Sequence, residues 1–296
     1  MTIPALGSPY LGMRHCRAFL DQLSSGGVAA PAALTDIAAA AGRLGAIQAG
    51  GDAIAQLVED VAGGKLAGQE LDDAITAAAN ARQVSVFKSE LVVMFDRRAA
   101  RLFAHALNDG AADEIIDSLR PAFNGSATAL VTALALVPPG VDAESFLASA
   151  TSEQLAAWKS IDEHVAKLTA IGSLVAQFGC KSTDFSLIAP PSRAGGWFCT
   201  QLSDLALLCT GPDVELTNAS ALFNTTGRHR NSPWFRAAPF LSLCTIAEAR
   251  EKLREAAEGE WEATSPSPNA RGVITPEGWK ATPIQNPYAK SESVPA

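Results

Sequence analysis

This sequence has little charge, few aromatic side chains and no long apolar run. Only 18% of its 296 residues are charged and 6% are aromatic, against about 25% charged residues in an average soluble domain. The longest nearly uncharged stretch, residues 126–140, ends in two prolines and a glycine and is shorter than the roughly 20 apolar residues that cross a membrane. We therefore expect no membrane partner. The sparse charge predicts either a surface that another chain covers in part or a large core beneath neutral polar side chains.

The short motifs of the common enzyme classes are absent as well. The sequence contains neither GxGxxG nor GxxxxGK[ST], the two common nucleotide-binding motifs, nor the GxSxG turn of hydrolases. Its five cysteines form no CxxC pair, which favours reduced, buried thiols over a structural zinc site. They are Cys16, Cys180, Cys199, Cys209 and Cys244. The sequence predicts no catalytic, cofactor-binding or metal-binding residue and a protein that is not an enzyme.

Basic side chains are scarce and concentrated in one segment. The net charge of −8 and the isoelectric point near 5.1 argue against general binding to nucleic acid, which requires a basic surface. One cluster combines arginine with aromatic side chains, a combination that suits protein interfaces and stacked bases alike. It consists of Arg228, Arg230, Trp234, Phe235 and Arg236. We predict a protein interface there; a surface loop without function and a nucleic-acid-binding adaptor that uses Arg228, Arg230, Trp234 and Arg236 are the alternatives.

One long segment, residues 71–107, contains no proline and no glycine. Apolar side chains recur in it at steps of three or four residues, which is the repeat of one helix face. They are Val84, Phe87, Leu91, Phe95, Ala99, Leu102 and Ala106. At about 1.5 Å per residue, a helix of this length reaches roughly 55 Å and exceeds the width of an ordinary domain. Such a helix needs partners along its length, from the same chain or from neighbours.

A second long helix is predicted from residue 151 to about residue 178. Thr151 and Gln154 have the spacing of a capping box, in which each side chain satisfies the backbone N–H of the other residue. Apolar residues then follow at close to the 3.5-residue repeat of a coiled-coil seam. They are Trp158, Ile161, Val165, Leu168, Ile171, Val175 and Phe178. We predict that the two long helices pack together as an antiparallel bundle.

The remaining predicted elements are shorter. We expect an acidic helix over residues 111–119 that ends before Pro121, a buried helix or strand over residues 126–137, and a charged helix that begins at a second capping box, Thr245 to Glu248. The predicted fold class is mainly α, a helical bundle with two long helices, a small irregular C-terminal module and an extended tail. The predicted regions are an N-terminal lead-in (residues 1–30), the helical bundle (31–180), the irregular module with a terminal helix (181–263) and an extended or disordered arm (264–296).

The last segment, residues 264–296, contains six prolines and few aliphatic side chains. It cannot build a core, so we expect no regular structure in it on its own. Two interpretations stay open: a disordered tail, or an arm that wraps a neighbouring chain. The anchors of such an arm would be Val273, Ile274, Trp279, Ile284 and Tyr288.

These features favour a non-enzymatic structural or assembly subunit that acts through protein contacts in a homo-oligomer or a larger multi-chain complex. A virion or tail component of a bacteriophage-like particle is one concrete instance. Residues 1–10 show no export signal, so we expect the protein in the cytoplasm or within an assembled particle. The enzyme alternative places a site in residues 181–245 that uses Cys199, His229 or Arg228.

Overall fold

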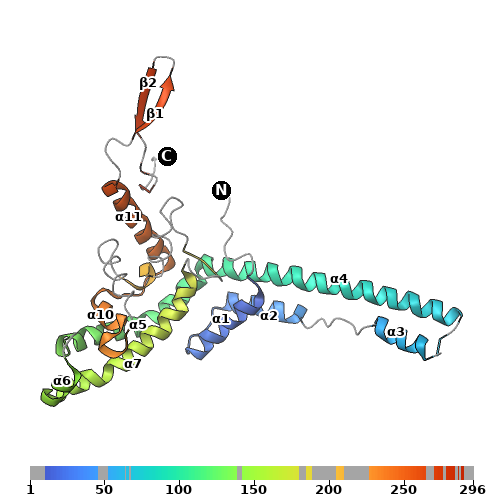
Figure 1. The fold of residues 1–296 in the computed structure, drawn as a ribbon, viewed down its shortest axis with the longest axis horizontal. Coiled ribbons are helices and arrows are strands. Elements are labelled where there is room, and N and C mark those ends of the chain that lie inside the picture. Colours follow the sequence, from blue (N-terminus) through green and yellow to red (C-terminus); the bar gives the residue numbers. More distant parts are fainter. Residues whose placement is uncertain are drawn as a thin grey trace.

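A computed structural model describes residues 11–45, 53–63, 65–66, 68–138, 142–179, 185–188, 205–209, 227–264, 270–275, 278–283, 286 and 288–289. The described chain is mainly α-helical, as predicted, and its helices form a bundle from which one long helix projects (Figure 1). In chain order the elements are α1 (Met13–Ser25), α2 (Ala32–Gly45), α3 (Ala53–Ala62), α4 (Gln69–Ala106), the π-helical turn η1 (Leu107–Ala111), α5 (Ala112–Leu136), α6 (Ala143–Ser149), α7 (Ser152–Val175), η2 (Ala176–Phe178), η3 (His229–Asn231), α10 (Pro233–Ala237), η4 (Ala238–Phe240), α11 (Ile246–Thr264), β1 (Ala270–Thr275) and β2 (Gly278–Pro283).

The longest element is α4, whose 38 residues extend over roughly 57 Å at the rise of an α-helix. Its bounds confirm the helix predicted over residues 71–107. α1 and α2 pack against the half of α4 that leads into the bundle, and α3 lies along its far end (Figure 1). Near the bundle, the Asp96 carboxylate accepts hydrogen bonds of 3.3 Å from the backbone N–H of Met13. This contact joins the beginning of α1 to α4.

Four phenylalanine rings hold the junction between α4 and the bundle. The ring centroid of Phe19 in α1 lies 6.4 Å from that of Phe103 in α4, 5.7 Å from Phe178 and 5.1 Å from Phe185. All four side chains are buried, with at most 1% of their surface exposed. Edge-to-face ring pairs add about 0.5–1.5 kcal/mol each beyond the burial of area. The cluster therefore fixes the base of the long helix to α1 and to the end of α7.

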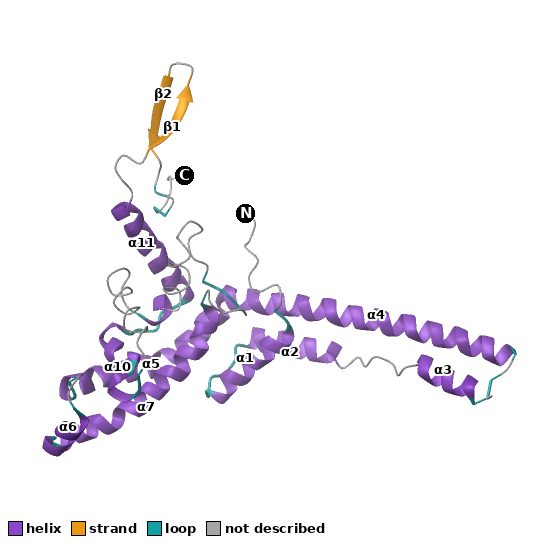
Figure 2. Cartoon of the chain, viewed as in Figure 1, coloured by secondary structure: helices purple, strands orange, loops and turns teal. Residues whose placement is uncertain are grey.

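α4 passes into α5 through η1, where Gly110 has φ 129° and ψ −22°. Residues with a Cβ rarely adopt a positive φ, so glycine permits the change of direction at this position. The two helices diverge from the turn, and α5 runs away from the long helix (Figures 1 and 2).

α5 corrects two predictions. We expected a helix that ends before Pro121 and a separate element over residues 126–137, but one helix runs through the proline from Ala112 to Leu136. Pro121 is exposed, whereas one face of the helix is buried on both sides of it. The buried residues are Ala112, Ile115, Ile116, Leu119, Phe123, Ser126, Ala127, Leu130 and Ala133. An interior proline weakens a helix by about 3 kcal/mol or more, and burial of this continuous face outweighs that loss.

α7 confirms the second long helix and its cap. The Gln154 backbone N–H donates to Thr151 Oγ1 at 3.2 Å, and the Thr151 backbone N–H donates to Gln154 Oε1 at 2.9 Å. Every residue of the predicted apolar row of α7 is buried or half-buried. The predicted pairing of the two long helices is wrong. After α6 the chain returns along α5, so α7 packs antiparallel to α5, while the turn at Gly110 directs α4 away from this pair (Figure 1).

Residues 227–264 pack on the α5–α7 pair through α10 and η4 and end in α11. The predicted capping box at Thr245 is present: its backbone N–H donates to Glu248 Oε2 at 2.7 Å, and the Glu248 N–H donates to Thr245 Oγ1 at 3.1 Å. Arg250 Nη2 donates to the Leu187 carbonyl at 2.6 Å and to Asn108 Oδ1 at 2.7 Å. Arg250 therefore ties α11 to the turn between α4 and α5.

The C-terminal segment contains regular structure that the sequence analysis did not expect. β1 and β2 pair antiparallel, with Ala270 opposite Pro283 and Thr275 opposite Gly278. The hairpin lies beyond the end of α11, away from the α5–α7 pair (Figure 2). Its strands satisfy backbone N–H and C=O groups by pairing. This pairing requires no core, whereas the composition of residues 264–296 bears only on the burial of side chains.

Candidate association surface

The exposed apolar side chains of the described chain are concentrated on α3 and α4. Ten of the twelve large ones belong to these two helices. They are Val58, Val61, Ile75, Val84, Val86, Phe87, Leu91, Val93, Met94 and Leu102. Phe87 is 65% exposed and Met94 is 71% exposed. Single exposed apolar residues are ordinary, whereas a concentration of them on one part of a protein surface is uncommon.

Among the described elements, the packing partners of α4 lie near its two ends, and its middle is exposed. α3 lies along the N-terminal part, and α1 and α2 lie near the bundle. None of residues 79–94 is buried, and only Ser85, Lys88 and Val92 are half-buried. Most of the circumference of the helix is therefore exposed in this stretch.

Opposite charges lie at the two ends of the uncovered stretch. The acidic end has Glu70, Asp72 and Asp73, and the basic end has Arg97, Arg98 and Arg101. None of these six forms an ion pair within the described residues. Acidic residues in a first turn complement the helix dipole, but that effect fades within one turn of each end. The three arginines lie more than a turn before Ala106, so the dipole does not account for them.

The predicted apolar stripe of α4 divides between core and solvent. Its exposed members are Val84, Phe87, Leu91 and Leu102, and the members that pack in or against the core are Phe95, Ala99 and Ala106. Met94 is not in the predicted stripe, because that stripe passes from Leu91 to Phe95 in a step of four residues. A step of three leads instead to Met94, the most exposed large apolar side chain among the described residues.

Residues of the predicted basic cluster make contacts within the chain. Arg228 is exposed. His229 Nε2 is hydrogen-bonded to the Trp158 carbonyl at 2.8 Å, and the two ring centroids are 4.4 Å apart. The Arg230 guanidinium lies 5.2 Å from the centroid of the same indole, and the Phe146 ring stacks on it at 5.2 Å. A cation over an aromatic face contributes about 0.5–1 kcal/mol at exposed sites, so His229 and Arg230 help to hold this segment on α7.

The remaining members of that cluster lie in α10. Phe235 is fully buried in the core of the chain, so its predicted place in an interface is not available in this fold. Trp234 is half-buried, with its ring centroid 6.1 Å from that of Phe123 in α5. Arg236 is half-buried as well. The aromatic residues of α10 therefore attach it to α5 and α7.

Tyr288 is the only predicted anchor of the arm whose side chain the structure describes. Its ring lies edge-to-face with that of Trp261 in α11, with centroids 6.3 Å apart. Arg254 Nη1 donates to the Tyr288 carbonyl at 2.7 Å. Tyr288 therefore contacts α11 of its own chain. The other predicted anchors lie outside the described side chains: Val273, Ile274, Trp279 and Ile284.

The residues of the alternative enzyme site do not meet in the described part of the chain. Cys199 lies outside the described residues, Arg228 is exposed and His229 packs on Trp158. Cys244 is buried, and its Sγ lies 2.8 Å from Lys252 Nζ. Within the described ranges, no group of three or more His, Cys, Asp or Glu residues is placed to hold a metal ion.

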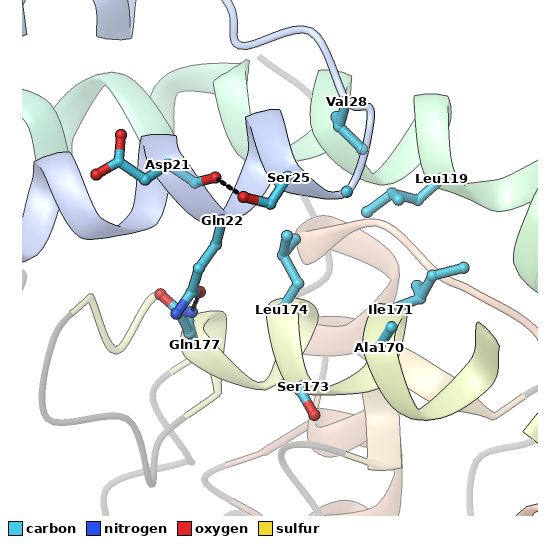
Figure 3. A pocket seen from close by; sticks show the side chains of 11 residues that line it. Asp21, Gln22, Ser25, Val28, Leu119, Ala170, Ile171, Ser173, Leu174 and Gln177 are labelled. Carbon is cyan, nitrogen blue, oxygen red and sulfur yellow. Dashed lines mark hydrogen bonds between the residues drawn. The ribbon is translucent and has the colours of Figure 1, made fainter. Parts of the chain in front are cut away.

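A cavity of about 500 Å³ opens between α1 and α7 (Figure 3). Leu119, Ile171 and Leu174 contribute to its apolar wall. At one side the amide groups of Gln22 and Gln177 meet in a hydrogen bond. Its lining therefore suits an apolar group.

Comparison with protein-family models, with curated proteins and with solved structures finds no match for this chain. Among the described residues, no helix is long and apolar enough to cross a membrane.

Proposed function

We propose that this chain is a non-enzymatic structural subunit that associates with copies of itself through the exposed apolar side chains of α3 and α4. The observation that carries the proposal is that, of the twelve large exposed apolar side chains among the described residues, ten lie on these two helices. A component of a bacteriophage-like particle is one instance of such a subunit.

The packing of the bundle supports this role for the long helix. The four phenylalanine rings and the α5–α7 pair supply a core that does not involve the uncovered stretch of α4. A partner can therefore cover α4 without unfolding the bundle. Burial of a large apolar side chain stabilises a complex by about 1.5–3 kcal/mol, so several such residues on one helix offset much of the entropy that is lost on association.

The native mass of the full chain tests this proposal. We expect sedimentation velocity between about 1 and 100 µM to show a species of at least twice the 30.7 kDa chain mass, with a fraction that grows with concentration. A monomer across this range would overturn the proposal.

A truncation locates the association surface. A chain that ends after Ala263 lacks the hairpin and the predicted arm but keeps α3 and α4. We expect it to keep the native mass state of the full chain. If the truncated chain is a monomer while the full chain is an oligomer, the contact belongs to the arm and the assignment to α4 is wrong.

A further inference from the structure

The exposed residues of α4 include a row with the spacing of a coiled-coil seam. From Asp73 onward, steps of four and three residues alternate without interruption, which is the 3.5-residue repeat of paired helices. We call this set the exposed row. Its members, all exposed, are Asp73, Ala77, Asn80, Val84, Phe87, Leu91, Met94 and Arg98. The seam of α7 is buried against its own chain, whereas this one has no covering element among the described residues.

The other exposed apolar residues of α4 do not form a comparable row. Ile75, Val86 and Val93 lie on a different face of the helix, about 100–120° from Phe87 at 100° per residue. Arg82 and Ser89 interrupt them at the same spacing. In the exposed row, by contrast, four large apolar residues follow one another without a polar residue between Val84 and Met94.

We infer that the exposed row pairs with the same row of a second copy of this chain, in antiparallel orientation. The inference rests on the proposed function and names its contact. In a parallel pair, Asp73 would face Asp73 and Arg98 would face Arg98, and like charges opposite one another destabilise a helix pair. Reversal of one helix places each Asp73 opposite Arg98 of the second copy.

The charges also define a register. With Asp73 opposite Arg98 of the second copy, the row is symmetric about a point between Val84 and Phe87. Val84 of each copy therefore faces Phe87 of the other copy. Ala77 then faces Met94. The same register places Glu70 near Arg101 of the second copy, so the acidic end of each helix lies along the basic end of the other.

One residue in the row is polar. In this register Asn80 faces Leu91 of the second copy, one layer outside the central Val84–Phe87 pairs. A single asparagine in a seam lowers stability and helps to select the register and the number of helices. The pair therefore consists of a small central apolar block with charged ends.

Adjacent residues provide a matched test of the seam. Phe87→Glu places a charge in the central layer, whereas Val86→Glu places the same charge beside it, on a residue that is 51% exposed and off the row. We expect Phe87→Glu in the full chain to raise the dissociation constant at least about 100-fold and Val86→Glu to change it less than about threefold. Met94→Glu and Val93→Glu repeat the comparison, and circular dichroism checks that each variant is folded. An oligomer that resists both row variants would overturn the seam and leave the proposed function standing, whereas a monomeric wild type would overturn both.

Charge reversal tests the orientation. Asp73→Arg places arginine opposite Arg98 at both ends of the pair, and Arg98→Asp places two carboxylates together. We expect each single variant to weaken dimerisation about tenfold at low salt. The double variant restores opposite charges in an antiparallel homodimer, so we expect its dissociation constant to lie within about threefold of that of the wild type. Failure of the double variant to recover would overturn the antiparallel register.

Discussion

The indole of Trp234 lies directly on the backbone of Gly172, where an added Cβ would come within 2.6 Å of Trp234 Cη2. Gly172 is in α7 and Trp234 is in α10, and the Phe123 ring of α5 meets the same indole edge-to-face. The three elements interlock at this position. Glycine in a helix interior is normally unfavourable by about 1 kcal/mol relative to alanine, so its presence reflects the space that the indole requires.

This contact predicts opposite effects for the same substitution in two helices. Gly172→Ala should lower the free energy of unfolding by about 1–2 kcal/mol, because the strain of overpacking exceeds the gain in helix propensity. Gly125→Ala in α5, where a Cβ meets no atom within 4 Å, should raise it by about 0.5–1 kcal/mol. Urea denaturation measures both. Equal stabilisation by the two variants would show that the indole does not limit the space at Gly172.

We predict that Arg250 holds the segment of residues 185–188 on α11. Its guanidinium donates to the Leu187 carbonyl and to Asn108 Oδ1. Arg250→Ala should lower the free energy of unfolding by about 1–2 kcal/mol and speed hydrogen exchange at the Leu187 backbone N–H, which donates to the Phe178 carbonyl. Asn108→Ala removes one acceptor only, so its effect should be smaller. Unchanged exchange at Leu187 in the Arg250 variant would argue against the link.

We predict that Arg254 of α11 holds the backbone near Tyr288 in place. The carboxylates of Glu251 and Glu258, at 2.9 and 2.6 Å, hold this guanidinium and raise its pKa, and its Nη1 reaches the Tyr288 carbonyl. Arg254→Ala should increase hydrogen exchange in residues 286–289 and lower the free energy of unfolding by about 1 kcal/mol. Lys167→Ala breaks an exposed ion pair of similar length on α7 and should change stability much less, because solvent screens that pair. If exchange in residues 286–289 is the same in both variants, Arg254 does not hold this segment.

Elements with local signals were predictable from the sequence. The cap formed by Thr151 and Gln154 involves residues three positions apart, so its geometry follows from the first turn of α7 alone. The extent of α4 follows from a long segment that lacks helix-breaking residues. In both cases the information lies within the helix itself.

Features that depend on distant contacts were not predictable in the same way. The passage of α5 through Pro121 depends on packing with α7 and α10, which the local pattern does not contain. The burial of Phe235 depends on the docking of a short helix that has no periodicity to read. For the candidate surface, the choice between Met94 and Phe95 as the next seam residue depends on which face of α4 the bundle covers.

We predict that Glu248, at the beginning of α11, makes the free energy of unfolding depend on pH. The hydrogen bond from the Thr245 backbone N–H is the main reason that the pKa of Glu248 lies below its ordinary value of 4.5, and the Arg120 guanidinium, 3.5 Å away, acts in the same direction. A lowered pKa in the folded state stabilises the fold above pH 4.5, and the contribution is lost as the pH falls through the folded-state pKa. Glu248→Gln keeps a capping side chain without the charge. We therefore expect it to be less stable than the wild type by roughly 0.5 kcal/mol at pH 7, with a difference that disappears as the pH falls below 4.5.

Glu248→Ala removes the hydrogen-bond acceptor as well. At pH 7 it should therefore be less stable than the glutamine variant, by about 1 kcal/mol relative to the wild type. A difference between wild type and glutamine variant that stays constant from pH 7 to pH 3 in urea denaturation would show that the charge of Glu248 does not contribute.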